Sequence, residues 1–312
     1  MAPFFAILEG MHAHPDRSEP LRETLVRREF AVGAQREKTE LFRAEAQRPV
    51  SNVPTVWIPG FAETSENFTE HMEAFAHDGR TALSVHCHHG IDTPAREGFP
   101  QPQLRKSEAL VQTLEAADEE GKVDLVGHSE GAVVACIAAL THPEKVRNVV
   151  LLNPAGMMGG DNLLRLGLSW MLEVTQEITR DITTIRNETV RRLQTVCLRE
   201  AKAYAASGPG HVVRQVAHLS NVDLRPWIRL LQERGIKVSV VMGRHDQIFP
   251  ARTIKKVAKQ IGIPRHRVHA MNGHHNMHIE DPRGAHMLIM RALAEMEAED
   301  NEQSEKRERR SA

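Results

Sequence analysis

The feature that most constrains this chain is a glycine–serine–glycine turn, Gly127-His-Ser129-Glu-Gly131. A short, largely apolar run over residues 122–126 precedes it, and an alanine-rich run over residues 132–140 follows it. We predict a strand that ends abruptly and turns into a helix, with glycines where the two backbones pass too close for a Cβ. Such a turn lifts the Ser129 hydroxyl out of the fold, beside the backbone N–H groups of a helix N-terminus. A serine held in this way can act as a nucleophile if a base lies nearby.

Two later segments end in residues that could serve this serine. A β-branched run over residues 236–242 predicts a strand that delivers Asp246 to a loop. Within residues 267–282, a second, shorter strand delivers a histidine, His274 or His275, to a loop before the last helix. The carboxyl ends of parallel strands share one edge of a sheet, which is where such folds place their sites. We therefore expect Ser129, Asp246 and a histidine near position 275 to lie at one edge.

Four segments carry a resemblance to a known family. They are residues 57–61 (Trp-Ile-Pro-Gly-Phe), 127–131, 243–250 (Gly-Arg-His-Asp-Gln-Ile-Phe-Pro) and 274–282. With the chain order serine, aspartate, histidine, the sequence resembles the α/β-hydrolase family over roughly residues 24–297. The resemblance implies an α/β fold, with a mainly parallel central sheet, helices on both faces and an inserted helical cap. Predicted strands that alternate with helices agree with this fold class.

The resemblance also implies roles for particular residues. Ser129 is the expected nucleophile of a Ser-His-Asp triad, and Asp246 is expected to orient the catalytic histidine. The expected oxyanion hole consists of the backbone N–H groups of Phe61 and Glu130. The Glu130 side chain could contact substrate or cap the helix N-terminus, and we favour capping. A haloalkane dehalogenase or an epoxide hydrolase is disfavoured, because those enzymes carry aspartate where this chain has Ser129.

The sequence leaves two candidates for the catalytic histidine, His274 and His275. In the family pattern, the histidine precedes an acidic residue by five positions, and that residue precedes a proline by two. Glu280 and Pro282 fit this spacing and favour His275. The family histidine usually follows a glycine, which favours His274, directly after Gly273. We predict His275 as the base and keep His274 as the alternative.

The sequence predicts four regions. They are an extended leader over residues 1–23, an α/β-hydrolase core over residues 24–156 and 234–297, a helical cap over residues 157–233, and a disordered charged tail over residues 298–312. The cap prediction rests on apolar positions at helical spacing, with no strand pattern among them. Extra helices packed against the core are the alternative, and we favour a cap because the family resembled here inserts its lid at this point. Residues 24–47 could form a charged helix or a hairpin, and we favour the hairpin, partly because the family usually begins in that way. The tail prediction rests on the absence of any apolar residue larger than alanine after position 297.

Composition excludes several classes of partner. The 312 residues are 41% hydrophobic and 26% charged, with a formal net charge of −1. This balance gives no reason to expect a nucleic acid partner. No apolar run approaches the roughly 18 residues that span a bilayer, and the N-terminus lacks the basic region of a secretory signal. The three cysteines are interpreted as reduced thiols, so we predict a cytoplasmic protein whose oligomeric state the sequence leaves open.

A histidine-rich segment, residues 85–89 (Val-His-Cys-His-His), resembles a metal cluster. It lies at a predicted strand end, where alternate side chains point to opposite faces, so one compact coordination shell is not expected. His278 is interpreted as a residue packed near the site or as a structural one. We predict neither a metal site nor a cofactor.

The predicted function is that of a serine hydrolase. It would cleave a carboxylic ester or a thioester of a small-molecule substrate through an acyl-enzyme intermediate. The cap is rich in Leu, Ile, Val and Met and the chain is poor in aromatic residues, which favours an aliphatic acyl group. The same triad also supports C–C bond hydrolysis, amide cleavage and perhydrolysis. A catalytically silent protein that binds a ligand in the capped pocket is the alternative from another class.

Overall fold

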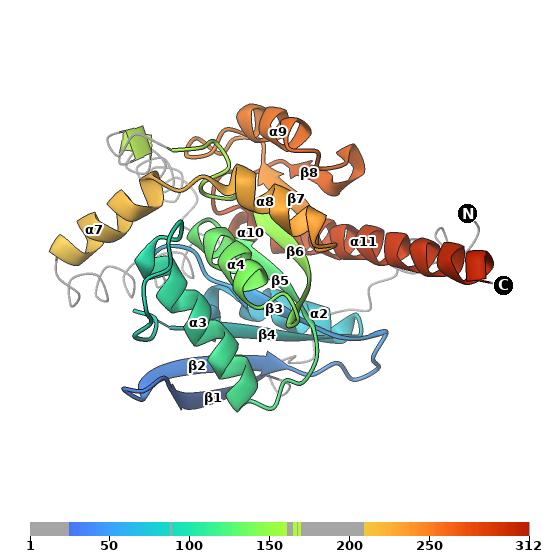
Figure 1. Ribbon diagram of the computed structural model, residues 1–312, viewed down its shortest axis with the longest axis horizontal. Coiled ribbons are helices and arrows are strands. Elements are labelled where there is room, and N and C mark those ends of the chain that lie inside the picture. Colours follow the sequence, from blue (N-terminus) through green and yellow to red (C-terminus); the bar gives the residue numbers. More distant parts are fainter. Residues whose placement is uncertain (1–24, 88, 161–164, 167, 170–208, 312) are drawn as a thin grey trace, which may run out of the picture.

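In the computed structural model, the described residues are 25–87, 89–160, 165–166, 168–169 and 209–311. The strands are β1 (Leu25–Val32), β2 (Glu37–Ala44), β3 (Ser51–Ile58), β4 (Arg80–His86), β5 (Val123–His128), β6 (Val146–Leu152), β7 (Lys237–Gly243) and β8 (Val268–Met271). Across the described chain they form one eight-stranded sheet in the order β1-β2-β4-β3-β5-β6-β7-β8 (Figure 1). From β4 to β8 the neighbours are parallel, whereas β1 and β2 add antiparallel pairs at one edge. The predicted hairpin and the mainly parallel sheet are therefore confirmed.

Helices cover both faces of this sheet, as predicted. They are η2 (Ser65–Phe68), α2 (Thr69–His77), α3 (Gln101–Ala116), α4 (Glu130–Thr141), α7 (Pro209–Ser220), α8 (Leu224–Glu233), α9 (Ala251–Gln260), η3 (Arg265–Arg267), α10 (Met277–Glu280) and α11 (Pro282–Ser311). Helices α3, α4 and α8 lie together on one face, and α2 and α11 lie on the other (Figure 1).

The two faces of the sheet build two apolar cores, because successive strand side chains point to opposite sides. On β3, Val56 and Ile58 belong to the core under α3 and α4. Trp57, between them, belongs to the other core, where its ring packs against Phe68 and Phe75 of the η2–α2 segment. Helix α4 is buried over nearly its whole length, as an Ala- and Val-rich helix between a sheet and further helices must be. Ser129 therefore directly precedes a central helix that packing holds in place.

The C-terminal region differs from the prediction. Helix α11 continues to Ser311, where the sequence predicted a disordered tail from residue 298. Its first half packs on the sheet through Ile289, Leu293 and Met296. Its second half extends beyond the rest of the molecule (Figure 1). Glu, Lys, Arg and Gln are good helix formers, so a polar segment can extend a helix that packing has already nucleated.

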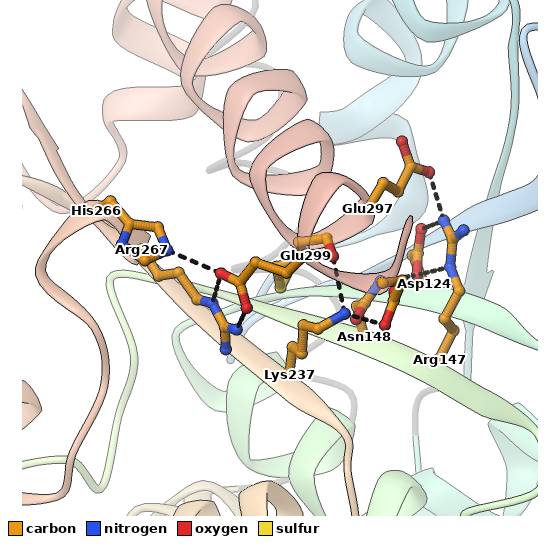
Figure 2. A network of polar contacts seen from close by, with 10 residues as sticks. Asp124, Arg147, Asn148, Lys237, His266, Arg267, Glu297 and Glu299 are labelled. Atoms are coloured by element: carbon orange, nitrogen blue, oxygen red, sulfur yellow. Dashed lines mark hydrogen bonds and ion pairs between the residues drawn. The ribbon is translucent and has the colours of Figure 1, made fainter. Parts of the chain in front are cut away.

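A network of charged residues joins α11 to the amino ends of the central strands (Figure 2). Arg147 on β6 donates to the buried Asp124 on β5, with Nε 2.9 Å from Oδ1, and also to Glu297 on α11 at 2.7 Å. The amide of Asn148 donates to Asp124 as well, at 3.1 Å. Burial raises the pKa of Asp124 in spite of the neighbouring Arg147, so desolvation of this carboxylate is costly. The guanidinium of Arg147 is the charge that offsets this cost.

A second part of the same network lies at β7 and η3 (Figure 2). Lys237 donates to the Met296 carbonyl at 2.8 Å, and Nε of Arg267 donates to Glu299 at 2.8 Å. These contacts hold α11 at the amino ends of the strands, whereas Ser129 lies at their carboxyl ends.

The remaining regional predictions are only partly covered by the described chain. The leader over residues 1–23 lies outside it, as do residues 161–164, 167 and 170–208 of the predicted cap. Helix α8, which the sequence assigned to the cap, packs on α4 and β7 and belongs to the helical layer of the core. Its apolar stripe faces the sheet because the helix leads directly into β7. Among the described helices, none combines the length and the apolar character that a bilayer span requires.

The Asp124 network gives a stability prediction. Replacing Arg147 by Ala leaves a buried carboxylate without its main counter-charge, so we expect a loss of about 3 kcal/mol in the free energy of unfolding. Urea unfolding at neutral pH measures this loss. Arg27→Ala is the matched control, because Arg27 is half exposed and pairs with Glu40 on the surface. That variant should change stability by about 0–1 kcal/mol. Equal effects of the two substitutions would contradict the assigned role of Arg147.

Candidate active site

Ser129 occupies a strained turn between β5 and α4. Its backbone angles, φ 51° and ψ −113°, lie where non-glycine residues are rare. A Cβ at Gly131 would come well within 3.0 Å of the Ile58 carbonyl oxygen, and one at Gly127 would overlap the backbone of Gly131. The predicted reason for the two glycines is therefore confirmed. The Ser129 N–H donates to the Leu152 carbonyl at 2.9 Å, which fixes the turn to β6.

Asp246 and His275 meet in the loops that follow β7 and β8. One carboxylate oxygen of Asp246 accepts the backbone N–H groups of Ile248 and Phe249, both at 2.8 Å. The other oxygen lies 2.9 Å from Nδ1 of His275. Asp246 is buried, and the ring of Phe249 packs against the imidazole of His275 with centroids 5.4 Å apart. The carboxylate is thus held rigidly toward one imidazole nitrogen, which leaves Nε2 for another partner.

His274 has different partners. Its Nδ1 lies 3.1 Å from a carboxylate oxygen of Glu280, and its backbone N–H donates to the same side chain at 2.9 Å. Of the two candidate bases, the structure therefore brings His275, and not His274, to Asp246. The glycine before His274 has a structural reason instead. A Cβ at Gly273 would overlap Met277, so this glycine does not mark the catalytic histidine.

Asn153, at the end of β6, is a site residue that the sequence did not single out. Its side-chain amide donates to the His275 carbonyl at 2.6 Å, and its Oδ1 accepts the Gly243 N–H at 2.8 Å. Asn153 also adopts a positive φ of 41°. It therefore connects the ends of β6 and β7 with the histidine loop. A helpful signal was present in the sequence, since an asparagine that ends a strand before proline often serves a turn.

The expected oxyanion segment lies against the elbow. Gly60 packs on the His128 carbonyl, and Gly131 packs on the Pro59 carbonyl, so the loop with Phe61 borders the start of α4. Phe61 and Glu130 thus come from adjoining segments. The Glu130 side chain accepts from Gln103 at 2.6 Å and from Lys106 at 2.8 Å on α3. It joins α3 to α4, and its carboxylate lies in the first turn of α4, where a negative charge is favoured.

A small apolar hollow adjoins these loops. It comprises about 240 Å³ of empty space, part of which is open solvent. It is lined by Ala155, Gly156, Met158, Gly159, Leu166, Leu219, Val222 and Phe249. Ala155 donates its N–H to the Ser129 carbonyl at 3.2 Å, and Phe249 touches His275, so the hollow borders the candidate site. Apart from backbone groups, its lining carries no polar side chain.

One group of possible metal-ligating side chains stands out in the described chain. Glu63, His128 and His278 place their ligand atoms within 4.8 Å of one another. The sequence analysis named neither Glu63 nor His128 as a site residue, and it interpreted His278 as packed nearby or structural. The histidine-rich segment over residues 85–89, of which residue 88 lies outside the described chain, contributes no member to this group.

Comparison with known proteins now identifies the family. The alpha/beta hydrolase family matches residues 55–285. The chain belongs to this family. The match spans β3 to the start of α11, and so includes the elbow, the Asp246 loop and the histidine loop. The resemblance inferred from the four segments is therefore confirmed.

Individual relatives are more distant. The chain is 29% identical over 173 residues to 2-hydroxymuconate semialdehyde hydrolase from Pseudomonas sp. strain CF600, over 53% of this chain and 59% of that protein. A thermophilic esterase from Thermogutta terrifontis has a TM-score of 0.63 at 15% identity, covering 87% of this chain and 99% of the esterase. A meta-cleavage product hydrolase from Pseudomonas fluorescens IP01 has a TM-score of 0.60 at 16% identity, over 86% and 97% of the two chains. These structures share the fold.

The close approach at the elbow gives a second prediction. In Gly131→Ala, the new Cβ must displace the end of β3, so we expect a destabilisation of about 3 kcal/mol or more, measured by thermal or urea unfolding. Gly160→Ala is the matched control, because nothing lies within 4 Å of a Cβ at that position. The control should leave stability unchanged. A stable Gly131→Ala variant would show that the elbow is less constrained than its geometry indicates.

Proposed function

We propose that the protein is a serine hydrolase that cleaves a carboxylic ester or a thioester through an acyl-enzyme. The observation that carries this proposal is the 2.9 Å contact between Asp246 and His275, at the same sheet edge as the strained Ser129. An imidazole oriented by a buried carboxylate, close to an elbow serine, is the arrangement that serine acyl transfer requires.

In the proposed mechanism, Ser129 Oγ attacks the acyl carbonyl while His275 accepts the serine proton through Nε2. Asp246 holds the Nδ1–H tautomer and stabilises the imidazolium that forms. The N–H groups of Phe61 and Glu130 donate to the oxyanion of the tetrahedral intermediate. His275 then protonates the leaving alkoxide or thiolate, and the same steps with water release the acid. The Asn153 contact keeps the His275 loop in place during both halves of the reaction.

The proposed substrate carries a small aliphatic acyl group. The apolar hollow beside Ala155 and Phe249 supports this choice, since its lining offers contacts to methylene groups and no polar side chain for an acyl tail. Its small volume favours a short chain. Leu166, Leu219 and Val222, which fall within the predicted cap, line the hollow, and we propose that this region selects acyl length.

A second candidate is hydrolysis of a ring-cleavage product by the same residues. It is favoured by similarity to 2-hydroxymuconate semialdehyde hydrolase and to a meta-cleavage product hydrolase. Parallel assays of p-nitrophenyl esters and of a meta-cleavage product distinguish the two candidates.

The nucleophile is tested by covalent labelling. A fluorophosphonate probe should label the wild type at Ser129, as located by mass spectrometry, and Ser129→Ala should remain unlabelled. Hydrolysis of p-nitrophenyl acetate or butyrate should fall on the order of 10⁴-fold or more in the variant, because the nucleophile is removed. Circular dichroism checks that the variant is folded. Unchanged hydrolysis by a folded Ser129→Ala variant would refute the proposed function.

The base is tested by a pair of neighbouring substitutions. His275→Ala should lose activity nearly as completely as Ser129→Ala, since the two residues act as a unit. His274→Ala should lose much less, because its side chain contacts Glu280 and not Asp246. The measurement is kcat with p-nitrophenyl butyrate for both variants. The opposite order would assign the base to His274 and leave the serine mechanism in place.

A further inference from the structure

A buried carboxylate lies behind the candidate site without taking part in the proposed chemistry. Glu63 comes from the loop after β3, and it faces His128 on β5 and His278 on α10. All three side chains are almost inaccessible to solvent, with 7%, 2% and 0% of their surface exposed. In sequence, His128 directly precedes Ser129, and His278 follows His275 by three positions. The cluster therefore adjoins the segments that carry Phe61, Ser129 and His275.

The Glu63 carboxylate closes the loop that carries the expected oxyanion donor. Its Oε2 accepts the Gly60 N–H at 2.6 Å, and the Glu63 N–H donates back to the Gly60 carbonyl at 3.3 Å. Between them, Ala62 adopts a positive φ of 66°, which costs energy for a residue with a Cβ. This tight turn sets the direction of the Phe61 N–H. Without the carboxylate, the Gly60 N–H loses its partner and the strained turn loses a restraint.

The same carboxylate reaches the histidine loop through two imidazoles. Glu63 Oε2 lies 2.8 Å from Nδ1 of His128, whose Nε2 lies 3.1 Å from the His275 carbonyl. Glu63 Oε1 lies 3.2 Å from Nε2 of His278, which is within ion-pair distance but lacks hydrogen-bond geometry. His71 on α2 donates from its Nε2 to the His278 carbonyl at 2.8 Å, and so fixes that residue from the other side. The cluster thus contacts the loop before α10 at His275 and α10 itself at His278.

Electrostatics keep Glu63 charged in this position. Burial by itself raises the pKa of this carboxyl group, but His128 and His278 outweigh burial and hold its pKa well below the usual range. A buried ion pair contributes little net stability compared with well-packed apolar residues. Stability alone therefore does not account for a charged group here, whereas its contacts lead directly to the Phe61 and His275 segments.

A carboxylate with two histidines is also a donor set that suits zinc. The geometry of the Glu63–His128 pair favours hydrogen bonding instead. The 2.8 Å separation of Glu63 Oε2 and His128 Nδ1 is a hydrogen-bond length. Two ligands of a tetrahedral zinc ion at its usual bond lengths are about 3.3 Å apart. In addition, Oε2 already accepts the Gly60 N–H.

We propose that Glu63 is a positioning residue, which holds the oxyanion loop and the His275 loop in a fixed relation to each other. Its carboxylate sets the turn before the Phe61 N–H, and through His128 and His278 it fixes the backbone that presents His275. This inference rests on the proposed serine hydrolase function. The role needs the negative charge and both carboxylate oxygens, because Gly60 and His128 approach one oxygen and His278 the other.

The test is Glu63→Gln, which keeps the side-chain shape but replaces one acceptor oxygen by an NH₂ group. The fluorophosphonate probe, applied to completion, counts the functional serines in each preparation. We expect kcat per labelled serine to fall on the order of 10²-fold, as for a misplaced oxyanion donor or base, with KM little changed. A residue that only stabilises the fold would lower the number of labelled serines and leave kcat per labelled serine unchanged.

Asp78→Asn is the matched control. Asp78 pairs with a largely buried histidine, His286, at 2.7 Å, but this pair joins α2 to α11 away from Ser129. The control should keep the wild-type kcat per labelled serine. The inference is overturned if Glu63→Gln keeps it too, or if Asp78→Asn loses as much. A wild type that the probe fails to label would instead refute the proposed function.

Two further measurements cover other outcomes. If Glu63→Gln does not fold, His278→Gln replaces it, and a wild-type kcat per labelled serine in that variant would overturn the inference. Elemental analysis of the purified protein, with kcat before and after dialysis against EDTA, tests the zinc alternative. We expect no stoichiometric metal and no change in kcat. One bound zinc ion per chain, with activity lost on its removal, would overturn the hydrogen-bonded role of Glu63.

Discussion

The close approach of three backbone segments at the elbow is the constraint on which the rest of the structure depends. Strand β5, helix α4 and the end of β3 meet so tightly that positions 127 and 131 have no space for a Cβ. This contact forces Ser129 into a rare backbone conformation, and it brings the Phe61 loop beside the first turn of α4. The burial of α4 in the core then offsets the local strain, because displacing the helix would expose its apolar surface.

Polar and charged groups at the two ends of the sheet have different consequences. At the amino ends of the strands, Asp124, Arg147 and Glu297 join β5 and β6 to α11 (Figure 2). These contacts are remote from Ser129 and serve the assembly of the sheet with its last helix. At the carboxyl ends, Glu63 and Asn153 contact loops that carry proposed site residues. Polar groups at this edge therefore restrain the loops that carry proposed site residues.

Much of the core could be predicted because its signals are local. Continuous β-branched runs predicted β6 and β7, and short runs on either side of Gly33 predicted the β1–β2 hairpin. The errors arose where long-range packing decides. Residues 298–311 lack apolar side chains and were predicted to be disordered, but they continue a helix that Ile289 and Leu293 nucleate by packing on the sheet. Helix α8 has cap-like amphipathic spacing, and only its contact with α4 shows that it belongs to the core.

The sequence by itself determined the family, the elbow with Ser129, and the strand ends that carry Asp246 and the histidine pair, because each depends on a local pattern of glycine and apolar residues. Tertiary structure decided which histidine meets Asp246, since His274 and His275 differ by one position and only the path of their loop separates their partners. It also decided the place of Glu63 and Asn153. Their partners lie far away in sequence, and a hydrogen bond between such residues depends on how the strand ends pack together, which no local pattern records.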